Sequence, residues 1–152
     1  MAEPSLEIAD HLATQINAMS GITATRVNIP LVRKEELANS GFTVQVTPMS
    51  FESPELDRNS ELQHYVTAVA GYQKAATKAL QDAAMEHMDD VRRKLSSLGL
   101  QSLSISGDGW SGASLILPLV SEPIFDPMRL REEHIFQSVV MVTYGIYRNR
   151  SS

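Results

Sequence analysis

The sequence contains no cysteine, and this absence excludes several kinds of chemistry. Without cysteine the chain has no disulfide framework, no thiolate ligand for a metal and no thiol nucleophile. The first residues, MAEPSLEIADHL, carry acids early and lack the basic-then-apolar layout of a signal peptide. We therefore expect a protein that is made and folded in a reducing cytoplasm.

Long apolar runs and basic residues are also scarce. No run approaches the roughly 18 apolar residues that a membrane-spanning helix needs, so we expect no membrane partner. The 152 residues hold 13 Lys and Arg against 18 Asp and Glu, which gives a net charge of −5. This balance argues against tight, non-specific binding of DNA, because such binding depends on neutralising phosphates with cations. A mildly acidic surface can serve solubility alone, or it can form a wall past which DNA slides.

Motifs that carry catalysis are missing as well. The sequence has no G-x-S-x-G elbow, and the glycines of GDGWSG fall between two expected strands rather than ahead of a helix. None of the four histidines has a partner at the spacing of a zinc site. His87 and Asp90 share one helix face and can touch a divalent ion, although a solvated patch is the commoner arrangement. We predict no catalytic residue, no cofactor and no metal, and hence a protein that is not an enzyme.

Two segments have the periodicity of amphipathic helices. Residues 5–19 place apolar side chains at steps of three and four, and Gly21 stands where such a helix stops. Residues 77–98 form the clearer helix, and Gly99 follows them as a stop signal. The two apolar stripes consist of Ala9, Leu12, Ala13, Ile16 and Met19, and of Leu80, Ala84, Met88, Val91, Leu95 and Leu98.

The segments between these helices favour strands. Residues 23–32 are rich in β-branched side chains, but Pro30 limits them to a sheet edge or a strand end. Residues 41–49 alternate in polarity, with Phe42, Val44 and Val46 on one face. A second strand over residues 61–75, after the polar residues 50–60, predicts a hairpin with a long, exposed tip.

The second half of the chain predicts another hairpin and a final strand. Residues 101–119 reverse direction at GDGWSG, where Gly107, Gly109 and Gly112 are expected to supply positive φ angles. Residues 121–134 carry two prolines and predict an irregular segment with one helical turn after Pro127, followed by a strand to residue 147. The whole predicts a single domain over residues 1–152 of the α+β class. We expect a mostly antiparallel sheet, packed with an N-terminal helix and one long central helix.

Several sequence pieces also occur in a recognisable order. These are VTPMS and DRNS around the first hairpin, GYQKA before the long helix, and FQSVVMVTYGIYR in the final strand. Over about Leu6 to Arg148 the chain resembles the tail terminator-like proteins of tailed bacteriophages and prophages. Residues 101–119 are less typical of that family, and we interpret them as an elaboration of this chain.

The resemblance implies a structural protein of the virion, located in the neck after assembly in the cytoplasm of a bacterial host. Such proteins form a ring, usually of six subunits, on the finished tail tube. The ring ends tube polymerisation and connects the tube to the head-side connector or head-closure protein. DNA passes through its channel without sequence-specific binding, and we expect a channel wall that is negative or neutral overall. The partners implied are other copies of the chain, the tail tube protein and the head-side protein.

Seven residues are candidates for contacts between subunits or with partners. Each has an ordinary alternative: a solvated loop residue at 58, a cover for the sheet end at 110, and a wet surface at 129–134. The final strand can lie close to a neighbouring subunit, or it can be a central strand inside one subunit. The candidates are Arg58, Trp110, Arg129, Arg131, Phe136, Tyr144 and Tyr147.

Other functions remain open at this point. The nearest alternative is another neck component, such as a head-closure or tail-completion protein. An accessory or baseplate component that binds through one face is a second, and a small-ligand or enzymatic domain is a third.

Overall fold

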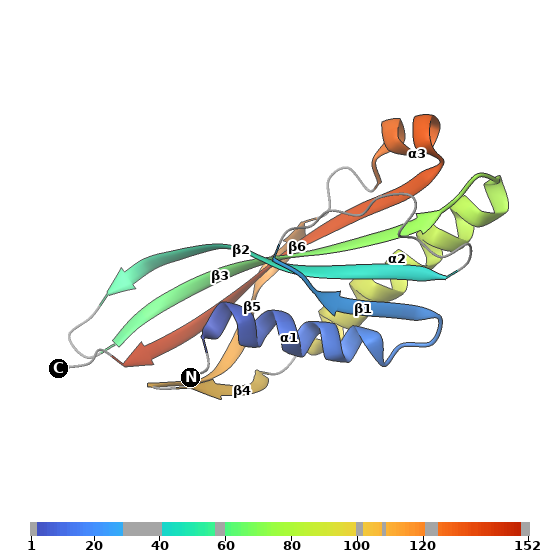
Figure 1. Ribbon diagram of the computed structural model, residues 1–152. Coiled ribbons are helices and arrows are strands. Elements are labelled where there is room, and N and C mark those ends of the chain that lie inside the picture. The colour runs from blue at the N-terminus through green and yellow to red at the C-terminus, as the bar shows by residue number, and fades with distance from the viewer. Residues whose placement is uncertain are drawn as a thin grey trace.

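The structure is a computed structural model that describes residues 3–28, 41–56, 60–99, 102–107, 109–120 and 125–149. The elements follow one another in the order shown in Figure 1. They are α1 (Pro4–Asn17), β1 (Ile22–Arg26), β2 (Phe42–Leu56), β3 (Ser60–Lys74), α2 (Lys78–Leu98), β4 (Leu103–Gly107), β5 (Trp110–Val120), α3 (Pro127–Glu133) and β6 (Ile135–Asn149).

The strands form one six-stranded sheet in the order β1-β2-β3-β6-β5-β4. β1 pairs with β2 in parallel, and every other neighbouring pair is antiparallel. The predicted α+β class is therefore confirmed, together with the mostly antiparallel sheet, the N-terminal helix and the long central helix.

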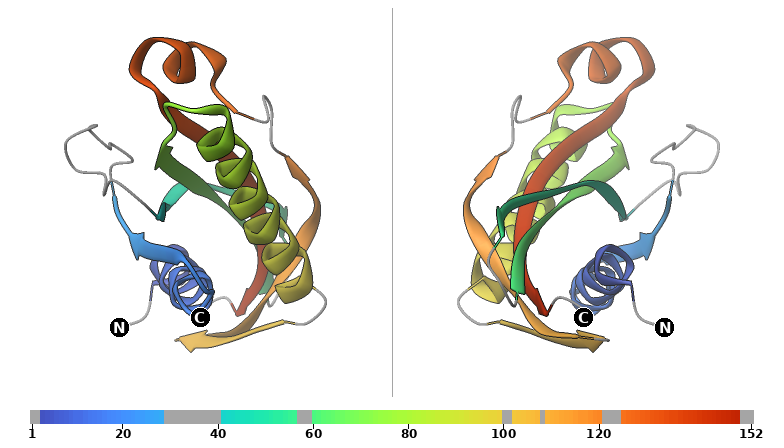
Figure 2. Two further views of the ribbon diagram at one scale, coloured as in Figure 1. Left: turned by 90° about the vertical axis from the view of Figure 1, so that its right-hand side faces the viewer. Right: turned by 90° about the vertical axis from the view of Figure 1, so that its left-hand side faces the viewer.

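The sheet curls around the two longer helices, as the end-on views of Figure 2 show. α1 lies between the two outer strands and contacts both β1 and β4, while α2 crosses the inner face of β3 and β6. Most of each predicted apolar stripe points into the core, because Leu12 and Ile16 of α1 and Met88 and Leu95 of α2 are fully buried. Leu80, at the start of the second stripe, is 36% exposed. The core thus sits inside the curl of the sheet.

The predicted bounds of the helices agree with the structure to within about two residues, because local capping signals set them. The Oγ1 of Thr77 accepts a hydrogen bond from the backbone N–H of Leu80 at 3.2 Å, and Gly99 is the C-cap that follows Leu98. The helical turn expected after Pro127 is α3, which begins after the N-cap Asp126. Within the described residues, no helix combines the length and the apolar character that crossing a membrane requires.

The long exposed tip predicted for residues 50–60 is wrong. β2 continues to Leu56, which pairs with Glu61, and only residues 57–59 lie between the two strands. The ladder shifts its register between Pro48 and Ser50 and again between Glu52 and Glu55. Such irregularities accommodate proline, which cannot donate to a ladder. The polar composition obscured this strand.

The second hairpin is confirmed, with one change in the role of its glycines. Gly109 and Gly112 have the predicted positive φ angles of 77° and 75°, but Gly107 does not adopt a positive φ. Gly107 pairs with Trp110 across the ladder, and a Cβ at residue 107 would lie 2.4 Å from Nε1 of the indole. Glycine is therefore needed there to make room for the Trp110 side chain.

β6 is a central strand. It pairs with β3 from Ile135 to Asn149 on one side and with β5 from Met141 to Arg148 on the other. Of the two arrangements considered for the final strand, the central strand within one subunit is confirmed. Its backbone pairs with β3 along the whole strand and with β5 from Met141 to Arg148, so over residues 141–148 neither side of β6 is open to a neighbouring subunit.

Candidate self-association surface

The outer strand β1 covers only the first part of β2. Pairing runs from Phe42 to Val46, and one further hydrogen bond joins the N–H of Val27 to the carbonyl of Val46 at 3.0 Å. Over residues 47–56, the described part of the chain supplies no strand on the outer side of β2. We refer to residues 47–56 as the β2 edge. Unpaired N–H and C=O groups in such an edge are a template for pairing with another chain.

The other outer strand, β4, leaves β5 partly uncovered in the same way. Its ladder with β5 ends at the pair Leu103–Ala113, and the hydroxyl of Ser102 lies 3.2 Å from that of Ser114. Beyond this point no strand among the described residues pairs with the outer side of β5. We refer to residues 115–120 as the β5 edge. The two edges lie on opposite sides of the sheet, with β3 and β6 between them.

Exposed apolar side chains accompany both edges. Met49 and Phe51 on the β2 edge are 52% and 54% exposed, and Val120 at the end of the β5 edge is 45% exposed. The ring of Phe51 lies against that of Tyr65 on β3, with centroids 5.2 Å apart. Large apolar side chains that stay in water beside an unpaired strand edge are typical of a contact surface.

A pocket of about 450 Å³ opens beside the β2 edge, between β2, β3 and the start of α1. Gln63 and Tyr65 line it from β3, and the Tyr65 hydroxyl donates to Oε1 of Gln63 at 2.8 Å. Pro48, Met49 and Phe51 line it from β2. The exposed side chains of Met49 and Phe51 therefore form one wall of this pocket, and residues of β3 and α1 form the others.

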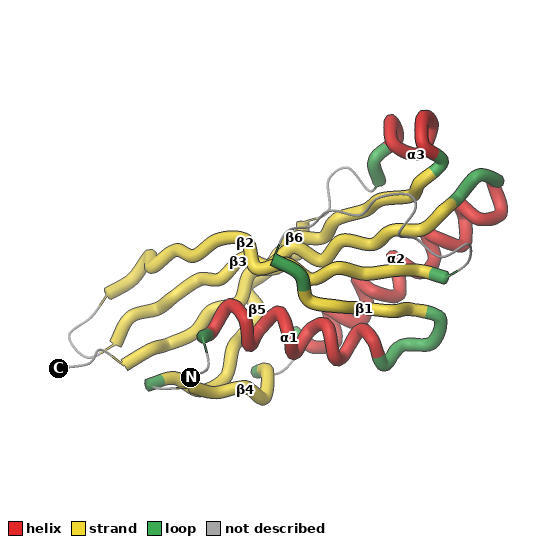
Figure 3. Tube along the Cα trace, viewed as in Figure 1, coloured by secondary structure: helices red, strands yellow, loops and turns green. Residues whose placement is uncertain are grey.

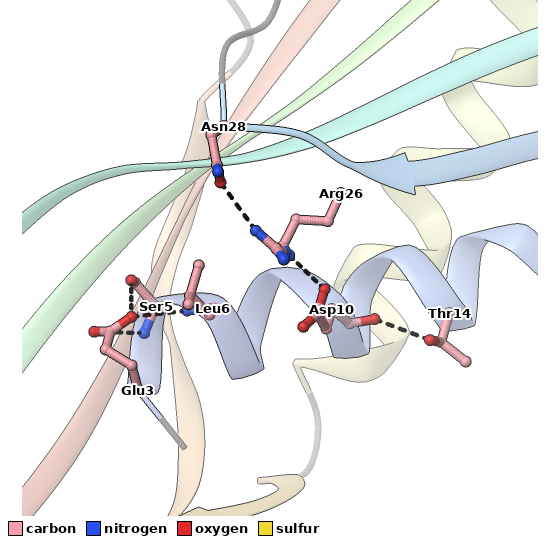
Figure 4. Close-up of polar contacts among 7 residues, drawn as sticks. All are labelled: Glu3, Ser5, Leu6, Asp10, Thr14, Arg26 and Asn28. Carbon is pink, nitrogen blue, oxygen red and sulfur yellow. Dashed lines mark hydrogen bonds and ion pairs between the residues drawn. The ribbon is translucent and has the colours of Figure 1, made fainter. Parts of the chain in front are cut away.

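The remaining wall of this pocket is the N-terminus of α1, which side-chain contacts hold in place (Figure 4). The carboxylate of Glu3 accepts hydrogen bonds from the backbone N–H groups of Ser5 and Leu6 at 3.2 and 3.1 Å. One turn later, Nε of Arg26 donates to Oδ1 of Asp10 at 2.6 Å, which ties α1 to β1. The ends of β2, β3 and β6 extend past this helix start, as Figure 3 shows.

Acid–base catalysis commonly uses two neighbouring groups whose pKa values are shifted in opposite directions, and the described residues show no such pair. Burial raises the pKa of Tyr144 to about 12 and also raises that of Tyr72, and burial lowers the pKa of His11. The described residues also contain no group of three or more His, Asp or Glu side chains able to hold a metal ion. His87 stacks on Phe42, with ring centroids 5.6 Å apart.

Three of the predicted contact residues lie in the core of the subunit. Phe136 and Tyr144 are fully buried and Trp110 is 5% exposed. Phe136 packs between Phe42 and Phe125, with ring centroids 6.3 and 5.9 Å away. The burial of Trp110 agrees with its alternative role, in which the side chain folds back and covers the end of the sheet.

The other four candidates differ in their surroundings. Arg58 lies outside the described residues. Arg129 donates to Glu133 within α3 at 2.8 Å and to Gln137 at 2.6 Å, and the second contact attaches α3 to β6. Arg131 is exposed, and Tyr147 is 67% exposed.

These seven residues do not form one surface, and their contact roles stay predictions. Sequence reasoning missed the exposed Met49, Phe51 and Val120. Pro48 and Pro54 were the signal that could have found the β2 edge, because proline inside a β-rich segment indicates an edge strand.

Comparisons with known proteins find a similar fold but do not assign the chain to a family. No protein-family model matches the chain, and no curated protein matches it. A chain from the virion of a native gene transfer agent particle is 13% identical, over 97% of this chain and 90% of that chain, with a TM-score of 0.43. A second solved chain, which carries no functional description, is 14% identical over 100% and 98% of the two chains, with a TM-score of 0.51. This second likeness, which spans both chains, shows that the fold occurs in another protein.

Proposed function

We propose that this chain is a structural protein of a phage-like virion, which assembles as a ring, usually of six copies, between the tail tube and the head. One observation carries the proposal: the sheet has two different strand edges, on opposite sides, that no strand of the described residues covers. Identical subunits that join head to tail need two different surfaces, and they close into a ring when the rotation between neighbours is right.

The sequence resemblance supports the more specific role of a tail terminator. Its segments lie in the central strands, with VTPMS where β1 leaves β2, GYQKA at the end of β3, and FQSVVMVTYGIYR along β6. In this role the ring binds the last layer of the tail tube with one face. Its other face differs from the tube protein, so no further tube subunit adds, and the head-side protein binds there instead.

The proposed ring performs no reaction, and its chemistry is that of a passive channel. DNA moves through it without adhering because the wall is negative or neutral overall, and like charges repel the phosphate backbone. The exposed face of α2 offers suitable acids, since Asp82, Glu86 and Asp90 all point into solvent. A ring whose bore is lined mainly by Lys and Arg contradicts this part of the proposal.

The proposal is tested by mixing the purified chain with uncapped tail tubes of the same particle. Native mass spectrometry is expected to show one closed oligomer, and electron microscopy is expected to show it at one end of each tube, where elongation stops. Binding to the head-side connector in preference to the tube supports a head-closure protein instead. A chain that stays monomeric with and without tubes, or a turnover abolished by one substitution, overturns the proposal.

A further inference from the structure

We propose that neighbouring copies join edge to edge, so that the β5 edge of one copy pairs with the β2 edge of the next. The inference rests on the proposed ring and specifies its subunit contact. It makes the sheet continuous from subunit to subunit, with main-chain hydrogen bonds supplying the contact, as in other cases of strand addition. The occupant of each edge is a second copy of this chain.

The strand directions suit this pairing. β2 and β6 run in the same direction, because each is antiparallel to β3. β5 is antiparallel to β6 and therefore runs opposite to β2. Rotation about a ring axis carries one copy onto the next without reversing strand direction along that axis. The β5 edge consequently meets the β2 edge of the next copy in the antiparallel sense, which is the slightly more stable arrangement.

The outer strands β1 and β4 are compatible with the contact if the copies are staggered. β1 ends beside Val46. Val46 pairs with Val69 on β3, which pairs in turn with Val140 on β6. β4 lies near the opposite end, because Trp110 aligns with Arg148. A shift along the strands moves β4 past the end of the neighbouring β2 and leaves β1 clear of β5. A stagger of this kind is what any closed ring of tilted strands requires.

The side chains at the two edges fit an interface between copies. Met49 and Phe51 are more than half exposed in the single subunit and stand at the mouth of the pocket beside the β2 edge. Val120 is the exposed apolar side chain at the end of the β5 edge. Pairing of the edges brings Val120 of one copy toward the exposed apolar side chains of the next, and removing apolar surface from water is the main favourable contribution to protein association.

The irregularity of the β2 edge explains why the pairing is selective. The two register shifts and the prolines at 48 and 54 interrupt the row of main-chain donors. Such devices protect an edge strand against unrelated chains. Only a partner strand whose own donors and acceptors match the remaining groups pairs well, and every copy of this chain carries the same β5 edge.

The absence of cysteine allows a direct test by cross-linking. Ser50 on the β2 edge and Val120 on the β5 edge are both exposed, so the double variant S50C/V120C is expected to fold. A short bis-maleimide, whose spacer tolerates a shift of register, should convert most of the monomer band into a ladder of covalent oligomers on a denaturing gel. The single variants S50C and V120C should give no ladder beyond a dimer.

A matched pair controls for random collisions. S20C/M128C places two exposed cysteines away from both edges, after α1 and on α3, and should leave most of the chain uncross-linked. A ladder from this control equal to that of S50C/V120C overturns the inference. Efficient dimers from S50C alone or from V120C alone also overturn it, because they indicate a symmetric contact.

The same samples separate this inference from the proposed ring. If native mass spectrometry shows a closed oligomer and S50C/V120C gives no ladder, the edge pairing is overturned and the ring proposal stands. If only monomer is found and no ladder forms, both are overturned. A ladder that ends at the size of the closed oligomer supports both.

Discussion

The ring of Phe42 on β2 packs against bare backbone at Gly71 on the neighbouring strand β3. A Cβ at residue 71 would lie 2.3 Å from Cζ of Phe42 and 2.8 Å from Sδ of Met88 on α2. Glycine at this position therefore lets α2 approach the sheet. It also leaves room for the cluster in which Phe42 contacts both His87 and Phe136.

This contact predicts that Gly71→Ala lowers the free energy of unfolding by about 1–3 kcal/mol, because overpacking forces neighbouring side chains off their rotamers. Urea unfolding measures the change. Phe42→Leu replaces the ring that collides with the new methyl group by a shorter side chain. The cost of Gly71→Ala should therefore fall in that background. Equal costs in both backgrounds contradict the proposed collision.

Tyr144 predicts an alkaline loss of stability. Its pKa is raised to about 12 by burial, above the usual value of 10.0, so between these pH values the unfolded chain loses the phenolic proton while the folded chain keeps it. The free energy of unfolding therefore falls as pH rises, by about 1.4 kcal/mol per pH unit from this group. Urea unfolding should show a smaller fall in Tyr144→Phe between about pH 10 and about pH 12.

The same variant tests the buried hydroxyl at neutral pH. No hydrogen-bond partner for the Tyr144 hydroxyl exists among the described residues. Removing a buried polar group without a partner is neutral or stabilising, so Tyr144→Phe should unfold at an equal or higher urea concentration near neutral pH. A loss of more than about 1 kcal/mol there indicates a partner for the hydroxyl.

Thr77 predicts a local cost at the start of α2. Its hydroxyl is the acceptor for the N–H of Leu80, so Thr77→Ala should lower the free energy of unfolding by about 1 kcal/mol. Thr77→Ser keeps the acceptor and should retain most of the stability. Thermal unfolding of the two variants side by side checks the difference, and identical melting temperatures count against a capping role.

Trp110 is the sole tryptophan, so its fluorescence reports on one site. Because the indole is buried in the subunit, we expect an emission maximum typical of an apolar environment, a red shift on unfolding, and no shift on assembly. Emission spectra recorded across the concentration range of oligomer formation provide the check. A change that follows oligomer formation identifies Trp110 as an interface anchor instead.

A substitution at Met49 should weaken assembly without lowering the stability of the subunit. Met49→Lys places a charge on the β2 edge, so ring formation should weaken by at least about tenfold, which corresponds to roughly 1.4 kcal/mol. Met128→Lys is the matched control, because Met128 is 56% exposed on α3 and lies away from both edges. Melting temperatures of both variants should equal that of the wild type, and sedimentation velocity measures assembly. Equal assembly of the two variants argues against the β2 edge.

Much of the fold was predictable from local patterns. The stripe at Leu12 and Ile16, the cap at Thr77 and the stop at Gly99 are properties of neighbouring residues, and a helix needs only these to begin, continue and end. The alternation of Phe42, Val44 and Val46 likewise identified a strand with one buried face. The polar stretch at residues 50–56 was misjudged because its residue types favour a loop, whereas its strand conformation comes from pairing with β3, which is not a local property.

Taken alone, the sequence determined the class of the fold, the order of its elements and the lack of catalytic motifs, since each depends on residue types and short spacings. Only the tertiary structure decided that β6 is central, that Trp110 and Tyr144 are buried, and that no strand in the described ranges pairs with the β2 and β5 edges. These properties depend on which strands become neighbours. Strand pairing joins residues far apart in the chain, so it follows from the packing of the whole sheet around α1 and α2.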